Sequence, residues 1–274
     1  MKVMKFSVVI PIYSGVDYDL LLSAVNSVTS NQTIRPYEVL IVSDGKGTED
    51  ICHRLQRDIK YLLKFLSYDK NRGPGFARDF GIRNATCEYV AIMDADDISL
   101  SERFELQIDE FKRNPNLSLC GGYIREYDFS CQDRSPCSIR TVPIKHQDIC
   151  SAIGIKSPFN NVTVMFRKSS YILSGGYPAM RSSEDYYLWG SFISSGLEVM
   201  NIGSILVDVN FNIAAINRRR GLKYFYDDLK TQRHLYHSNC INLFRFVLNL
   251  IKYFCFRLMP AVFIKKIYLR VLRG

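Results

Sequence analysis

The sequence lacks the features that mark several classes of protein. Its eight cysteines form no C-x-x-C pair and no Cys/His cluster with the spacing of a zinc site. Only nine prolines and 16 glycines are spread through 274 residues. The composition therefore excludes a disordered, collagenous or low-complexity chain, and the scattered cysteines indicate reduced thiols of a cytosolic protein. With 47% hydrophobic residues, the chain is expected to form one large α/β domain or two small ones around a sizeable core.

Acidic residues are missing from the C-terminal segment, where none follows Asp228. Residues 229–274 contain nine Lys and Arg residues, so this segment carries the whole formal charge of +9 and residues 1–228 sum to zero. A nucleic-acid-binding module would interleave basic residues with exposed aromatics in its body. The neutral body therefore argues against nucleic acid as a partner.

An uninterrupted hydrophobic run is also missing. Residues 241–264 form the most apolar stretch, but Asn242, Arg245, Asn249, Lys252 and Arg257 fall within roughly 140° of one helical face. Arg or Lys at the centre of a spanning helix costs about 2.5–3.5 kcal/mol. The pattern favours an amphipathic helix lying on a membrane surface, with a soluble helical subdomain and a true membrane span as the alternatives.

The first half of the sequence alternates strand-like and helical patterns. Apolar runs at residues 7–13, 37–43, 62–68 and 88–94 resemble strands, and apolar residues recur at helical spacing between them. Such alternation predicts a mostly parallel sheet with helices on both faces. Further along, Ser99 and Glu102 suggest a capping box that opens a helix through Phe111. Residues 162–167 are expected to form a strand and residues 184–193 a helix.

Acidic residues follow two of these strands, where an open α/β sheet binds its ligands. Asp44 follows the second strand, and Asp94, Asp96 and Asp97 follow the fourth. Clustered carboxylates suit Mg²⁺ or Mn²⁺ shared with substrate phosphates. For the acidic group after the fourth strand, the alternative is a solvated loop in which Asp97 or Ser99 caps the next helix. For Asp44, the alternative is a turn, because Asp-Gly is a common turn pair.

Two further segments carry candidate chemistry. Gly73 and Gly75 precede a predicted helix with Arg78 one turn in, a pattern that can admit and neutralise a phosphate. Glu184 and Asp185 precede Trp189, the only tryptophan. They could supply a general base beside an aromatic ring, or only complement the helix dipole.

The motifs occur in the order S-V-V-I-P-I-Y, I-V-S-D-G, N-R-G-P-G-F-A-R-D-F-G-I, M-D-A-D-D-I-S and G-G-Y…S-E-D-Y-Y-L-W. In this order they resemble the inverting family 2 glycosyltransferases with the GT-A fold, over about residues 7–210. Stretches such as C-G-G-Y-I-R-E and P-F-N-N-V-T-V-M-F-R-K are similar to a narrower bacterial subset. Those enzymes assemble exopolysaccharide, capsule, O-antigen or lipopolysaccharide-core sugars, as amylovoran-type glycosyltransferases do.

The resemblance implies roles on the donor side. Pro11 and Tyr13 would line the nucleobase pocket, and Asp44 would accept a hydrogen bond from the base. Arg78 would lie near the diphosphate. Asp94 would contact the donor ribose or the metal, and Asp96 would bind the metal directly.

On the acceptor side, the resemblance implies that Asp185 deprotonates the attacking hydroxyl, with Glu184 and Trp189 shaping the site. One base and no nucleophile would mean single displacement with inversion. Three positions differ from the family pattern. Ser43 stands before Asp44 where the family often has a second acidic residue, which leaves the expected contact with the base intact. Asp79 stands where Asn is common, and Asn161 stands where the bacterial subset usually carries His.

These features together predict a metal-dependent glycosyltransferase using Mn²⁺ or Mg²⁺. It would move one sugar from a nucleotide sugar, with a UDP-sugar expected, to a growing glycan on a lipid carrier. Residues 1–221 would form the GT-A domain, divided into a nucleotide-sugar half (1–115) and an acceptor half (116–221). Residues 222–274 would form a basic amphipathic tail that holds the enzyme on the anionic cytoplasmic face of the membrane. The alternatives are a nucleotidyltransferase or a catalytically inactive glycosyltransferase-like binding protein.

Overall fold

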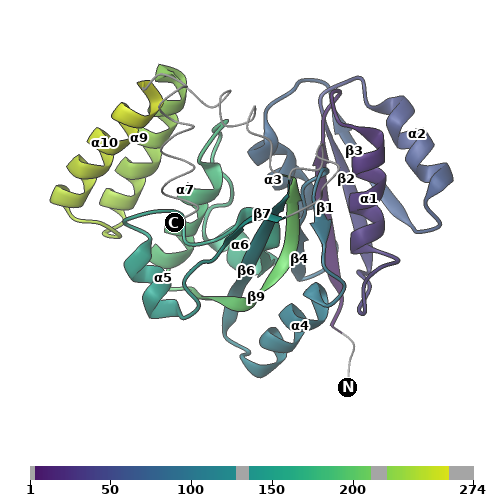
Figure 1. Ribbon diagram of the computed structural model, residues 1–274, viewed down its shortest axis with the longest axis horizontal. Coiled ribbons are helices and arrows are strands. Elements are labelled where there is room, and N and C mark those ends of the chain that lie inside the picture. The colour runs from purple at the N-terminus through teal and green to yellow at the C-terminus, as the bar shows by residue number, and fades with distance from the viewer. Residues whose placement is uncertain (1–3, 128–135, 211–220, 259–274) are drawn as a thin grey trace.

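A computed structural model describes residues 4–127, 136–210 and 221–258 of the chain. Its N-terminal part alternates strands and helices in the order β1 (Phe6–Ile12), α1 (Tyr18–Val28), β2 (Glu38–Asp44), α2 (Glu49–Asp58), β3 (Leu63–Tyr68), α3 (Pro74–Asn84) and β4 (Tyr89–Ile92). The strands lie in the order β3-β2-β1-β4, and all three pairings are parallel. Because helices cover both faces (Figure 1), β1 and β2 are almost continuously apolar and buried along their length.

The second part of the sheet is mixed. Its elements are β5 (Ile98–Ser99), α4 (Arg103–Arg113), β6 (Leu117–Tyr127), β7 (Pro136–Arg140), α5 (His146–Ala152), the 3₁₀ turn η1 (Asn161–Thr163), β8 (Met165–Arg167), α6 (Lys168–Leu173), α7 (Glu184–Ser194) and β9 (Glu198–Asn210). Strand β8 is antiparallel to both β4 and β6, whereas β6 and β9 are parallel. The predicted α/β fold is confirmed, and its parallel part is confined to β1–β4 and the β6–β9 pair.

Two hydrophobic clusters lie on opposite faces of the sheet. One contains Leu21 of α1, Leu55 of α2 and Phe104 of α4. The other contains Ala77 of α3 and Trp189 of α7. Strand residues alternate between the clusters, as Cβ atoms alternate across a strand. The helices of the two clusters therefore cover the two faces of the sheet.

Two local predictions were wrong. Ser99 does not cap a helix, because it lies in β5 and pairs with β9, and its N–H donates to Ser27 Oγ at 3.0 Å. Helix α4 begins four residues later, with Glu102 at its N-cap and no side-chain capping bond. The strand expected over residues 162–167 is shorter, because η1 occupies its first part.

Two helices, α9 (Leu222–His237) and α10 (Leu243–Leu258), follow the sheet and lie side by side next to α7 (Figure 1). The polar face of α10 turns inward. Asn249 is 3% exposed and donates to the carbonyl of Gly154 at 2.9 Å and to Gln232 at 2.7 Å. Its apolar face turns outward, leaving Leu243, Phe244, Val247, Leu248, Ile251, Phe254 and Leu258 exposed.

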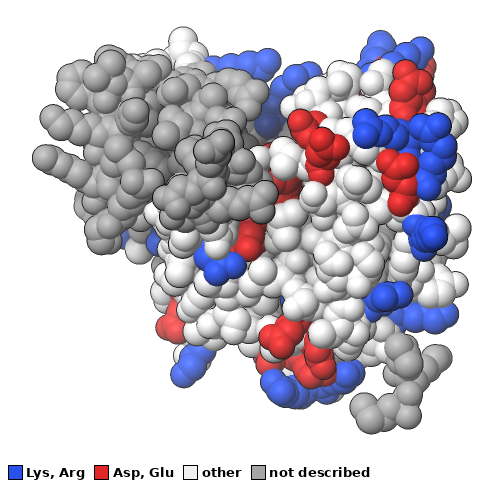
Figure 2. All heavy atoms as spheres, turned by 45° about the vertical axis from the view of Figure 1, so that its right-hand side comes forward, with Lys and Arg blue, Asp and Glu red and all other residues white. Residues whose placement is uncertain are grey.

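None of the described helices combines the length and apolarity needed to cross a membrane. Residues 259–264, the end of the apolar stretch seen in the sequence, lie outside the described part. On the face shown in Figure 2, Lys and Arg side chains are interspersed with Asp and Glu, as expected for a body whose formal charges cancel.

Candidate active site

The structure brings the predicted donor-side residues to one edge of the sheet. Pro11 is near the end of β1, Asp44 ends β2, and Asp94 comes two residues after β4. Because these strands are parallel and adjacent, their carboxyl ends meet. Tyr13 follows β1, is 51% exposed, and lies against Gly15, where an added Cβ would come 2.6 Å from the tyrosine ring.

Asp44 fastens the loop that precedes α3. Its carboxylate accepts the backbone N–H of Arg72 at 2.7 Å and of Gly73 at 2.9 Å, and the hydroxyl of Tyr68 at 2.8 Å. Burial, and then the bond to Asp44, raise the pKa of Tyr68, so that hydroxyl keeps its proton. Asp44 therefore shapes the loop over which a donor would lie, and its contact with a base stays a prediction.

The glycines before α3 allow a close approach between α3 and α7. Gly73 has φ 93°, a conformation that favours glycine. At Gly75, an added Cβ would come 2.9 Å from Cγ of Glu184. The absence of a side chain at this position lets the start of α7 lie directly on the start of α3.

Arg78 joins the two sides of the site across this contact. Its guanidinium donates to Asp94 at 2.7 Å and to Glu184 at 3.0 Å. Burial alone would lower the pKa of Arg78, but the nearby carboxylates outweigh it and raise the pKa. Arg78 is therefore a permanent buried cation between the end of β4 and the beginning of α7.

The acidic loop after β4 concentrates negative charge. Asp97 is buried and accepts the N–H of Asn210 at 2.8 Å. Burial, then Asp94 and Asp96, raise its pKa well above the usual value, which shows that the three carboxylates repel one another. Asp96 is exposed at the surface of this loop.

No group of three or more metal-ligating side chains is assembled within residues 4–127, 136–210 and 221–258. The donor set nevertheless fits a hard cation. Asp94 and Asp96 supply carboxylate oxygens at a strand end, where negative charge is in excess, and such ions commonly complete their coordination with substrate phosphates.

Arg103 lies buried beneath the acidic loop and was not identified from the sequence. It donates to the carbonyl of Ile92 at 2.8 Å and to Gln107 at 3.2 Å. Burial lowers its pKa to about 9, against the opposing effect of Asp94 and Asp97. Its i, i+4 spacing to Gln107 on the same helix was the available signal in the sequence. In the structure Gln107 donates to the carbonyls of Cys120 and Thr163.

The start of α7 presents Asp185 beside this charged cluster. Asp185 is half-buried and accepts the N–H of Tyr186 at 2.8 Å. The pKa of Tyr177 is raised chiefly by burial, lowered by Arg78, and raised by Asp185 and other carboxylates nearby. Tyr177 therefore lies within the field of both the donor-side arginine and the predicted base.

Two of the positions expected to differ from the family pattern, Asp79 and Asn161, have structural partners. Asp79 accepts the hydroxyl of Tyr171 at 2.7 Å and pairs with Arg83 at 2.8 Å. Asn161 accepts the hydroxyl of Tyr177 at 2.8 Å. In this structure Asp79 braces α6 against α3, and Asn161 holds a tyrosine of the site.

Trp189 lies in the core. It is 0% exposed and packs against Phe159 and Phe192. Its ring cannot stack on a sugar here, because no part of it reaches the surface. The aromatic ring expected beside the general base is therefore buried, and any influence of Trp189 on the acceptor side would be exerted through the packing of α7.

The C-terminal helices α9 and α10 hold Ser183, the residue that precedes Glu184 and Asp185. Ser183 has φ 57°, in the left-handed region, and its hydroxyl donates to Asp228 of α9 at 2.8 Å. Arg257 of α10 in turn pairs with Asp228 at 2.6 Å. This chain of contacts joins α10 to the start of α7, and it links residues too far apart in the sequence to be anticipated.

The sheet carries carboxylates at its strand ends, and Asp94 faces Glu184 across the buried Arg78. This arrangement is the one expected of a glycosyltransferase. The model of Glycosyl transferase family 2 matches residues 7–168. The chain belongs to this family, as its motifs predicted, and the nucleotidyltransferase alternative gains no support.

Similar bacterial proteins extend over most of the chain. A UDP-Gal:alpha-D-GlcNAc-diphosphoundecaprenol beta-1,3-galactosyltransferase of Escherichia coli is 34% identical over 98% of this chain and 97% of its own length. The amylovoran biosynthesis glycosyltransferase AmsE of Erwinia amylovora is 33% identical over 83% of this chain and 84% of its own. The narrower bacterial subset expected from the sequence is thus confirmed.

Solved structures share the fold. S. aureus TarS in complex with UDP-GlcNAc has a TM-score of 0.64 at 16% identity and covers 98% of this chain and 76% of its own. The mannosyltransferase PcManGT from Pyrobaculum calidifontis, in complex with GDP-Man and Mn²⁺, has a TM-score of 0.60 at 15% identity and covers 100% and 82%. At these identities the likeness concerns the fold alone.

Proposed function

We propose that the chain transfers one sugar from a UDP-sugar to a growing surface-polysaccharide glycan on a lipid carrier, with inversion at the anomeric carbon. The observation that carries the proposal is the bridge from Asp94 through Arg78 to Glu184, which places donor-side carboxylates beside the start of α7. The name of the Escherichia coli relative supports both the donor class and the lipid-linked acceptor.

In the proposed reaction, the acceptor hydroxyl loses its proton to Asp185 while its oxygen attacks C1 of the donor sugar. The bond between C1 and the diphosphate oxygen breaks, and the nucleoside diphosphate leaves with the electron pair. A positioned general base of this kind typically contributes 10²–10⁴-fold to the rate. Arg78, as a buried fixed cation, favours the negative charge that develops on the leaving group.

Asp94 and Asp96 would hold Mg²⁺ or Mn²⁺ together with the donor diphosphate. When bound, the ion would stabilise the charge of the departing nucleoside diphosphate. The Asp94 carboxylate also pairs with Arg78, so Arg78 would hold it in place whether or not the metal is bound.

The enzyme would work on the cytoplasmic face of the membrane, held there through residues 222–274. The outward apolar side chains of α10, which include Phe244 at 73% and Ile251 at 57% exposed, support this placement. An amphipathic helix binds by burying such a face at the boundary of headgroups and acyl chains. The basic residues of the tail would add attraction to anionic lipids.

A donor panel tests the proposed function. Wild-type protein, Asp96→Ala and the control Asp109→Ala would be mixed with UDP- and GDP-sugars, with and without Mn²⁺. Asp109 lies on α4, is half-buried and pairs with Lys112. Thermal stability and transfer to lipid-linked acceptors would then be measured. We expect one donor to raise the melting temperature with metal and to support transfer, both lost only in Asp96→Ala. Folded wild-type protein that neither binds nor uses any donor would overturn the proposal.

A further inference from the structure

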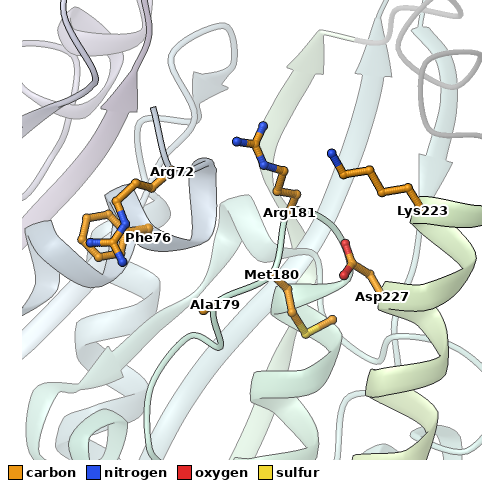
Figure 3. Close-up of a pocket in the computed structure, with 7 residues that line it drawn as sticks. All are labelled: Arg72, Phe76, Ala179, Met180, Arg181, Lys223 and Asp227. Carbon is orange, nitrogen blue, oxygen red and sulfur yellow. The ribbon is translucent and has the colours of Figure 1, made fainter. Parts of the chain in front are cut away.

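A cavity of about 290 Å³ lies beside the candidate active site (Figure 3). It is formed by the loop and first turn of α3, by the loop before α7 and by α9. Its lining residues are Arg72, Phe76, Ala179, Met180, Arg181, Lys223 and Asp227. Three elements far apart in sequence therefore converge on one hollow, which suits a small ligand.

The cavity carries more positive than negative charge. Arg181 and Lys223 extend toward the same side of the hollow (Figure 3), and neither is paired with a carboxylate of the described residues. Arg72 lies over the ring of Phe76, with its guanidinium carbon 3.5 Å from the ring centre. The single lining carboxylate, Asp227, already accepts Ser182 Oγ at 3.1 Å and lies 3.9 Å from Lys230.

Such a set of side chains suits a ligand with several negative oxygens. Arginine presents a planar fork of donors to phosphate, and lysine adds a mobile point charge. Asp227 already has partners of its own, and among the described residues no other carboxylate lines the cavity beside these three cations. This excess of positive charge favours an anionic ligand.

The position of the cavity relates it to both substrates. Arg181 Cγ lies 3.6 Å from the Cβ position of Gly73, whose N–H is held by Asp44. Arg181 also comes four residues before Asp185. The cavity therefore borders the loop before α3, and it borders the loop that leads into α7 and the proposed base.

We infer that this cavity binds the diphosphate of a lipid-linked acceptor through Arg72, Arg181 and Lys223. The inference rests on the proposed function and gives its acceptor a binding site. The donor also contains a diphosphate, so the shared chemistry is a diphosphate group, and the test must separate the two sources.

The test compares two acceptors that carry the same sugar, one joined to an alkyl chain through a diphosphate and the other through an uncharged ether. Wild type, Arg181→Ala, Lys223→Ala and Arg233→Ala, an exposed control on α9, would be assayed with both. Loss of one charge-assisted contact is expected to lower kcat/KM for the diphosphate acceptor by about tenfold or more. The uncharged acceptor, the donor KM and the control should change less than twofold.

Equal losses of kcat/KM on both acceptors would overturn the inference. A raised donor KM would also overturn it, and would assign the cavity to the donor. If wild type transfers sugar to no acceptor, the proposed function fails instead. Calorimetric titration with geranyl diphosphate then still decides the question. Saturable binding by wild type and Arg233→Ala, lost in Arg181→Ala, supports the cavity as a diphosphate site. Absent or identical binding in all three overturns it.

Discussion

Single residues connect the two sides of the site. Arg78 binds carboxylates that lie 16 residues after it and 106 residues after it in the chain. The sequence indicated Arg78, Asp94 and Glu184 separately, because each belongs to a short motif. The hydrogen bonds that join these three residues could not be predicted, since they depend on how closely α7 approaches α3 at Gly75.

Replacing Asp185 by Asn should lower kcat about 10²–10⁴-fold, because the amide cannot accept the acceptor proton. The affinity for UDP should stay within twofold, since among the described residues no hydrogen bond or ion pair joins Asp185 to the loop before α3. Stopped assays of transfer and calorimetry with UDP would measure the two quantities. A variant that retains more than a tenth of the wild-type kcat would show that Asp185 is not the base.

Replacing Asp79 by Asn, the more common residue of the family at this position, should leave transfer within about twofold of wild type. The amide oxygen can still accept the hydroxyl of Tyr171, and only the half-exposed ion pair with Arg83 is lost. Unfolding in urea should show a loss of about 1 kcal/mol or less. A large change in donor KM would instead reveal a phosphate contact at this position.

At the scale of elements, α9 and α10 hold the N-terminal end of α7 in place. The helical patterns of these segments were recognisable in the sequence, but their tertiary contacts were not. Ser99 illustrates the same limit, because a favourable capping sequence gave way to pairing between β5 and β9. Trp189 illustrates it again, since local polarity did not reveal that its ring would be enclosed.

Replacing Arg257 by Ala should lower both stability and kcat, while UDP affinity stays unchanged. Asp228, whose side chain is 2% exposed, would lose its buried cation, a loss that typically costs about 3–5 kcal/mol. The start of α7 would then be less well held through Ser183. Urea unfolding, kcat and UDP titration measure these effects.

Arg113→Ala is the matched control, because Arg113 forms an ion pair of the same length, 2.6 Å, but is 70% exposed. It should cost about 1 kcal/mol or less and leave kcat unchanged. If Arg257→Ala lost stability but kept the wild-type kcat below its melting temperature, α10 would have no part in positioning α7.

At the scale of the whole molecule, the net charge and the exposed apolar face of α10 both belong to the C-terminal segment. The body carries no net formal charge, and the C-terminal segment carries all of the excess. The sequence predicted an amphipathic helix correctly, but the orientation of its faces depends on partners elsewhere in the chain. The polar face of α10 turns inward because it forms hydrogen bonds with Gly154, Gln232 and Asp228. Its apolar face is therefore left exposed to solvent.

The double variant Phe244→Ser with Ile251→Ser should bind anionic phosphatidylglycerol vesicles at least tenfold more weakly than wild type. Burying each large apolar side chain contributes about 1.5–3 kcal/mol. Vesicle sedimentation measures the binding, and thermal unfolding verifies the fold. Leu62→Ser provides the control, because Leu62 is 81% exposed before β3 and far from α10 in the sequence. Undiminished vesicle binding by the double variant would exclude this face as the membrane contact.

The inward polar face of α10 has a practical consequence for protein preparation. Truncating the chain before this helix would remove Asn249 from Gln232 and Arg257 from Asp228. A truncated enzyme would therefore be expected to lose activity for reasons unrelated to lipid. Exchanging only the outward side chains for hydrophilic ones would preserve those bonds, and it offers the better route to an enzyme that can be purified without detergent.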